Sequence, residues 1–194
     1  GLDALIAGDS DRAVEQLTQA VRDNPRNVDA YVKLGNVLRE RGQVKQATQI
    51  HRELLVKRKL PTSVRSEIIK NLARDLASAG RWRDVLEHLA TLPRSERSDP
   101  RVLIMTRDAY ESAGDLDKAA QAHKELLKAG SIEGEPAQGV YRANLGLVAL
   151  TRGDTRRAKA EFQAAVKEDP GAGLAYVYLG DIAVREEDTE RAVA

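Results

Sequence analysis

Small and apolar residues recur along the chain with a fixed period. The dipeptide Leu-Gly stands at 34–35, 145–146 and 179–180, and the last two copies are one such period apart. A turn is expected seven positions after such a glycine, and the glycines in this phase are Gly8, Gly42, Gly80, Gly114 and Gly153. A period of about 34 residues is typical of repeat proteins, so the pattern predicts a stack of helix–turn–helix units.

The expected core of each second helix is counted from its turn glycine. A small or β-branched residue comes five positions after the glycine, and a further core position follows after four more and again after three more. The three sets are Ala13, Ala47, Val85, Ala119 and Ala158; Leu17, His51, Leu89, His123 and Phe162; and Ala20, Leu54, Leu92, Leu126 and Ala165. Residues with these spacings share one face of a helix. A lone hairpin cannot bury this face, so neighbouring units are expected to stack around a continuous core.

These residues resemble the tetratricopeptide repeat (TPR), in which each unit is a helix, a tight turn and a second antiparallel helix. Tyr31 and Tyr176 stand where the repeat has an aromatic residue, and Pro25 and Pro170 where it has proline. The resemblance implies an all-α fold, a right-handed α-solenoid of TPR helix hairpins with a concave groove lined by the first helices. It implies a single array over 1–194, with full repeats at 28–61, 66–99, 100–133 and 139–172 and partial repeats at 1–27 and 173–194.

Several segments depart from the regular pattern. Four extra residues, 62–65, and five more, 134–138, separate units, and Lys59 and Ser131 stand where proline is usual. We expect longer loops or extended helices at both junctions. The acidic run Glu186-Glu187-Asp188 is expected at a helix end and turn, exposed to solvent.

The order of these features also resembles the lipopolysaccharide assembly protein B family. The resemblance rests on the run Leu-Gly-Asn-Val-Leu-Arg-Glu-Arg-Gly-Gln-Val at 34–44, on Asn71-Leu72-Ala73-Arg74-Asp75-Leu76, and on the order and spacing of 1–194. It implies a cytoplasmic scaffold that is attached to the inner membrane only through an N-terminal anchor and that carries a C-terminal metal-binding domain. The implied anchor and metal-binding domain are not in these 194 residues. Such scaffolds tie lipopolysaccharide synthesis to a membrane AAA protease that degrades a lipid A biosynthetic deacetylase.

Composition and motifs narrow the chemistry. The 31 basic and 30 acidic residues nearly cancel, and cysteine is absent, which excludes disulfides, thiolate metal sites and a cysteine nucleophile within these 194 residues. Known catalytic, phosphate-binding and dinucleotide-binding motifs are missing, so we predict no enzyme, no catalytic residue, no metal and no cofactor. His51 and His123 occupy equivalent positions two repeats apart and are expected to pack within their helices rather than to share a metal ion.

Basic residues are concentrated between Arg52 and Arg83, a stretch that contains nine basic and three acidic residues. Nucleic-acid binding would call for interleaved aromatic residues, and Trp82 is the one aromatic residue in this stretch, so no nucleic-acid partner is expected. A solvated helix face is the simplest interpretation, and an acidic protein or membrane headgroups are the alternatives.

The predicted groove changes character along its length. The repeat places a polar, charged set on its concave side, followed by an apolar pair; they are Asn36, Arg39, Lys70, Asn71, Arg74, Arg101, Asp108, Leu147 and Leu150. A protein or peptide partner with an acidic end and an apolar end would complement this surface. The leading hypothesis is therefore a non-enzymatic protein–protein interaction scaffold or adaptor.

Two alternatives remain open, and one further expectation concerns the ends. The carboxylate clamp of chaperone-binding TPR modules matches at Asn36, Asn71 and Arg101 but fails at Val32 and Met105. The chain could instead be the TPR arm of a larger enzyme. At the C-terminal end Tyr176, Leu179 and Ala183 should be only partly covered, which predicts self-association through the cut ends.

Overall fold

The computed structural model describes residues 2–57, 59–130 and 136–193, with side chains over 10–56, 59–130 and 136–187. All regular secondary structure in these ranges is helical. The chain divides into two compact units, Gly1–Ala113 and Gly114–Ala194, and each is described by itself. Their boundary falls inside the predicted repeat 100–133.

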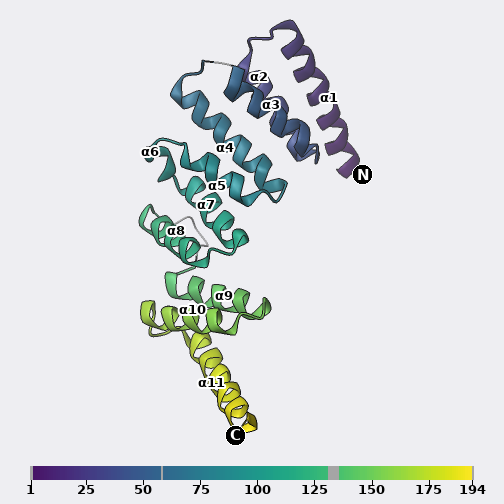
Figure 1. Ribbon diagram of the computed structural model, residues 1–194. Coiled ribbons are helices and arrows are strands. Elements are labelled where there is room, and N and C mark those ends of the chain that lie inside the picture. Colours follow the sequence, from purple (N-terminus) through teal and green to yellow (C-terminus); the bar gives the residue numbers. More distant parts are fainter. Residues whose placement is uncertain (1, 58, 131–135, 194) are drawn as a thin grey trace. The chain divides into compact units, whose positions relative to one another are not determined.

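The first unit holds seven helices among the described residues (Figure 1): α1 (Leu2–Asp23), α2 (Val28–Glu40), α3 (Val44–Lys57), α4 (Thr62–Ser78), α5 (Trp82–Ala90), α6 (Arg94–Arg97) and α7 (Pro100–Ala113). Successive helices pack side by side from α1 to α5, and α5 packs against α7. In addition α2 contacts α4, and α4 contacts α7. The first helices of successive hairpins therefore form one layer of this unit, with α3 and α5 in the other.

The second unit holds four helices among the described residues: α8 (Leu116–Lys128), α9 (Gln138–Thr151), α10 (Thr155–Glu168) and α11 (Gly173–Val193). Helices α9 and α10 form its central hairpin. Helix α8 packs on α9, and α11 packs on α10 and more lightly on α9.

Four of the five predicted turn glycines are confirmed. Gly42, Gly80, Gly114 and Gly153 have φ between +69° and +84°, a backbone region that other residues adopt at a cost. Side chains at the starts of helices complete the turns, since Asn27, Asp115 and Asp154 accept hydrogen bonds from backbone N–H groups of the first turns of α2, α8 and α10.

Two predicted turns are wrong. Gly8 lies inside the continuous helix α1, and Glu186-Glu187-Asp188 lie inside α11. One glycine costs a helix only about 1 kcal/mol, and the good helix formers Ala4, Leu5 and Ala7 before Gly8 and Arg12 and Ala13 after it favour a continuous helix. The acidic run contains no glycine at all, so nothing in it favours a left-handed residue. Glu186 is half-exposed and pairs with Lys159 at 2.5 Å.

The structure describes one of the two irregular junctions completely and the other in part. The extra residues 62–65 form the first turn of α4, which matches the expected extended helix. Of the second insertion, residues 134 and 135 lie outside the described residues, and Gln138 begins α9. The four-residue helix α6, which the pattern did not predict, has Pro93 as its N-cap, and the Pro93 carbonyl accepts hydrogen bonds from the Glu96 and Arg97 N–H groups.

The predicted core positions are buried in every described hairpin. Ala47, Val85, Ala119 and Ala158 are at most 1% exposed. The next core position in each helix is at most 3% exposed, and its residues are His51, Leu89, His123 and Phe162. In α1 the equivalent residues Ala13 and Leu17 are only half-buried. No described helix is long and apolar enough to cross a membrane.

Candidate functional site

Two of the hairpins are built around a glycine that receives a ring from the opposite helix. A Cβ built on Gly35 of α2 would lie 2.6 Å from Cε1 of His51 in α3, and one built on Gly146 of α9 would lie 2.5 Å from Cε1 of Phe162 in α10. The sequence separation between glycine and ring is the same in both pairs, so the two hairpins share one antiparallel register. The Leu-Gly dipeptide thus marks a slot for a flat side chain.

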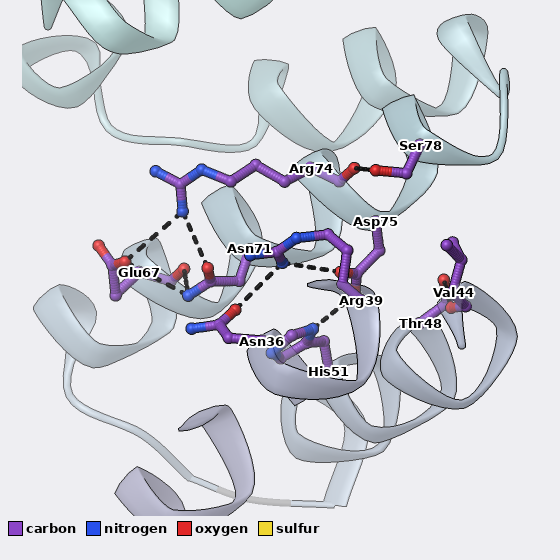
Figure 2. A network of polar contacts seen from close by, with 10 residues as sticks. All are labelled: Asn36, Arg39, Val44, Thr48, His51, Glu67, Asn71, Arg74, Asp75 and Ser78. Atoms are coloured by element: carbon purple, nitrogen blue, oxygen red, sulfur yellow. Dashed lines mark hydrogen bonds and ion pairs between the residues drawn. The ribbon is translucent and has the colours of Figure 1, made fainter. Parts of the chain in front are cut away.

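In the first unit this slot holds a histidine, and the histidine needs a polar partner. His51 Nδ1 donates to Asp75 Oδ2 of α4 at 2.6 Å, and both side chains are fully buried. Arg39 of α2 donates to the other carboxylate oxygen at 2.9 Å and to Asn36 at 3.1 Å (Figure 2). A buried carboxylate is tolerated only when it is paired and hydrogen-bonded, and here α2 and α3 both supply donors. The polar trio Arg39, His51 and Asp75 therefore joins the three helices α2, α3 and α4.

A second polar cluster runs along α4 beside this trio. Asn71 is buried, donates to the Glu67 carbonyl and carboxylate, and accepts from Arg74 at 2.8 Å (Figure 2). Arg74 is 37% exposed and lies 3.9 Å from Glu67. Lys70 is 18% exposed and pairs with Glu96 of α6 at 2.7 Å. Of these cations, Arg74 presents the most surface to a partner.

The other predicted groove residues lie on separate helices. Arg101 is exposed in the first turn of α7, and Asp108, further along α7, accepts from Arg107 at 2.9 Å. Leu147 and Leu150 of α9 are partly buried and pack against the apolar core of the second unit. The structure therefore brings together Asn36, Arg39, Asn71 and Arg74, with Lys70 one turn before Arg74.

The amide contacts bear on the carboxylate-clamp hypothesis. Such a clamp needs an asparagine side-chain N–H that can donate to the ligand. The Asn71 amide already donates to Glu67 and accepts from Arg74, and its side chain is buried. The sequence matches at Asn36, Asn71 and Arg101 do not form a ready clamp in this geometry.

The second unit holds its own buried carboxylate. Glu161 of α10 is 1% exposed and accepts from Arg142 of α9 at 2.8 Å and from Arg157 at 2.6 Å. Arg157 also donates to Asp117 of α8 at 2.9 Å. This hydrogen bond lowers the pKa of Asp117 and raises the pKa of Arg157. Three helices are again tied to one buried acid.

The histidines have the packing roles that the sequence predicted. His51 lies on Gly35, as described above. His123 is fully buried, stacks on Tyr141 with ring centroids 4.0 Å apart, and donates through Nε2 to the Pro136 carbonyl at 2.8 Å. Within the described residues, no group of three or more His, Asp or Glu side chains is arranged to hold a metal ion.

A tetratricopeptide repeat family model matches residues 1–62 and 144–194, more than half of the chain. The chain belongs to the tetratricopeptide repeat family. Lipopolysaccharide assembly protein B of Escherichia coli K12 is 24% identical over 198 aligned positions, which cover all of this chain and 50% of that protein. The TPR chain thus spans about half the length of the curated relatives it matches.

Solved TPR structures share the fold. The crystal structure of MamA superposes with a TM-score of 0.60 at 19% identity, covering 87% of this chain and 93% of that one. YrrB, described as a TPR protein with an unusual peptide-binding site, gives 0.59 at 16% identity, covering 88% and 83%. A TPR protein from Parabacteroides merdae gives 0.59 at 19% identity over 99% of this chain and 73% of that one. The predicted all-α class of TPR helix hairpins is confirmed, and this fold is typically a non-enzymatic module that binds proteins or peptides.

Proposed function

We propose that this TPR array is a non-enzymatic scaffold that binds a segment of a partner protein along α2, α4 and α7. The observation that carries the proposal is the layer of first helices, on which Arg74 and Arg101 present cationic groups at the surface. An acidic segment of a partner would displace Glu67 from Arg74, and cationic surfaces also speed the approach of such a segment.

We further propose that the scaffold serves lipopolysaccharide assembly on the cytoplasmic side of the inner membrane. Alignment of the whole chain with lipopolysaccharide assembly protein B supports this role. The first partners to test are the membrane AAA protease and the lipid A deacetylase that the family resemblance implies.

The test measures binding of the purified chain to the soluble domain of that protease and to the deacetylase, across a salt series. Changing Lys70, Arg74 and Arg101 together to Glu should weaken binding by about tenfold or more, since three attractive charges become repulsive. The melting temperature is measured in parallel, because Lys70 also pairs with Glu96. Arg74→Gln alone should give a smaller loss with no effect on folding.

A matched control reverses three exposed arginines elsewhere, Arg52 in α3, Arg65 in the first turn of α4 and Arg83 in α5. The same change in net charge should leave binding nearly unaltered. Equal binding by the wild type and the first triple variant at every salt concentration would overturn the docking face. Failure of the wild-type chain to bind either protein would overturn the lipopolysaccharide role.

A further inference from the structure

A groove lies between the first half of α3 and the turn that joins α4 to α5. Its volume is about 880 Å³, and its walls come from residues of 42–53 on one side and from Ala79 and Arg81 on the other. Ligand pockets typically have volumes of about 300–1,000 Å³. The groove belongs to the first unit and to the layer of α3 and α5, whereas the docking face proposed above lies on α2, α4 and α7. It is therefore a separate surface.

Cations outnumber acids in the lining of this groove. Lys45, Arg52 and Arg81 are exposed there, and Glu53 is the one acid among the described lining residues. Arg81 pairs with an aspartate of α5, but neither Lys45 nor Arg52 has an ion-pair partner within the part of the chain that the structure describes. Arg52 also acts across the groove on α5, since the pKa of His88 is lowered by burial and next by this guanidinium. Two cations are thus available to an anionic ligand.

Side-chain amides line the same wall. Gln43, Gln46 and Gln49 follow one another at intervals of three residues, which places neighbours close together on a helix surface. Gln49 donates to Glu53 at 3.0 Å, whereas the amides of Gln43 and Gln46 make no hydrogen bond to any described group. A side-chain amide both donates and accepts, as each residue of an extended backbone does. The wall therefore offers partners to a peptide backbone as well as to acidic side chains.

We propose that this groove binds an extended acidic segment of a second partner protein, with carboxylates on Lys45 and Arg52 and the backbone on Gln43 and Gln46. The described lining has no aromatic side chain on which a nucleic-acid base could stack. Its one large apolar side chain is the half-buried Val44, so it also lacks the apolar surface with which proteins enter a membrane interface. The inference does not rest on the function proposed above, because a segment bound here leaves α2, α4 and α7 open.

The test measures fluorescence anisotropy of a labelled peptide of alternating glutamate and glycine, titrated with the 194-residue chain up to about 1 mM. The acidic peptide should bind, and more weakly as salt is added, whereas a peptide with lysine in place of glutamate should not bind. Lys45→Gln combined with Arg52→Gln should raise the Kd of the acidic peptide by about tenfold or more. Failure of the wild type to bind the acidic peptide would overturn the proposal.

The matched control is Lys59→Gln combined with Arg83→Gln. It removes the same charges from two exposed side chains that do not line the groove, and the Kd should change by less than about twofold. Equal weakening by the two double variants would show general attraction by net charge and overturn the groove. All four side chains are exposed, so every variant should fold, which circular dichroism checks.

The amides are tested without any change of charge. Gln43→Ala combined with Gln46→Ala should raise the Kd severalfold and leave its salt dependence as in the wild type, because Lys45 and Arg52 remain. An unchanged Kd would overturn recognition of the peptide backbone by this wall.

Two further measurements separate this groove from other anion-binding surfaces. If Arg74→Gln combined with Arg101→Gln abolishes peptide binding while the Lys45 and Arg52 variant binds fully, the peptide lies on α4 and α7; the groove is then overturned and the proposed function stands. Vesicles containing phosphatidylserine are the membrane probe. If they bind the wild type, fail to bind the Lys45 and Arg52 variant, and the acidic peptide does not bind at all, the groove faces a membrane and the protein partner is wrong.

Discussion

The hairpins α2–α3 and α9–α10 solve one packing problem with different chemistry. Both set a flat ring on a glycine of the opposite helix, His51 on Gly35 and Phe162 on Gly146. Phe162 requires no hydrogen bond and stacks on Tyr178 of α11, with ring centroids 5.2 Å apart. His51 takes a carboxylate, Asp75, from the next helix, and Asp75 in turn takes Arg39. The glycine selects a flat ring at the opposite position. The polarity of that ring then determines whether the neighbouring helix must provide a hydrogen-bonding carboxylate or an apolar contact.

This difference makes the first hairpin dependent on a residue outside it. An apolar ring gains stability by burial alone, whereas a buried ion pair roughly balances its desolvation cost and is damaged when one partner is lost. We therefore expect substitution of Asp75, in α4, to destabilise the α2–α3 hairpin more than the loss of an apolar contact within the hairpin does. No such distant dependence is expected of Phe162.

The largest expected effect is that of Asp75→Ala. The change leaves the nearly buried Arg39 and the buried His51 without their acceptor, which should lower the free energy of unfolding by roughly 3–5 kcal/mol. Urea denaturation followed by circular dichroism measures the loss. Asp29→Ala, at an exposed pair with Lys33, is the control and should cost under about 1 kcal/mol.

Converting the polar hairpin to the apolar kind sharpens the same experiment. The triple variant Arg39→Met, His51→Phe and Asp75→Leu replaces the buried pair with hydrocarbon of similar size, which often restores stability fully. It should therefore be more stable than Asp75→Ala alone. A triple variant as unstable as the single one would show that the polar trio is not interchangeable with an apolar filler.

The second prediction compares three glycines that have the same position in the repeat. Gly35→Ala and Gly146→Ala each place a Cβ within 2.6 Å of a ring, and overpacking of this kind costs about 1–3 kcal/mol. Gly180→Ala meets no described atom within 4 Å and should instead stabilise α11 by up to about 1 kcal/mol. Thermal unfolding of the three variants gives the order. A loss of stability at Gly180 equal to that at Gly146 would mean that the slot in α11 is already filled.

The sequence pattern predicted the features that depend on nearby residues. Turn glycines and the residues five and nine positions later could be placed because a hairpin is local, and Gly42 and His51 lie as expected. Gly8 misled the prediction because the same residue type occurs in the interior of a helix. The recurrence of Leu-Gly marked Gly35 and Gly146 as equivalent positions, but it did not show that a ring from the other helix of the hairpin packs on each glycine.

The polar trio could not be predicted, because its members are far apart in the chain. His51 and Asp75 are 24 residues apart, and Arg39 and Asp75 are 36 apart. A signal was nevertheless present, since Asp75 lies between Leu72 and Leu76 on the apolar face of its helix. Glu161 beside Phe162 gives the same signal. A charged residue on the buried face of a TPR helix indicates a paired acid, but its partners become known only from the stacking.

The smallest expected effect is that of Asp117→Asn, which removes the exposed partner of Arg157. Arg39 bonds to buried Asp75, whereas Arg157 divides its donors between buried Glu161 and exposed Asp117. The hydrogen bond from Arg157 holds the pKa of Asp117 below its usual value of about 3.9. A carboxyl whose pKa is lower when folded adds stability above its unfolded pKa and loses it as the pH falls through the folded value. Asp117→Asn should thus lower the urea midpoint slightly at pH 7 and less at each step below about pH 5, until the variant and wild type coincide. A constant difference down to about pH 2 would mean that the charge of Asp117 contributes nothing. Asp108→Asn, which removes the same charge from α7, is measured alongside, so that a general effect of net charge is subtracted.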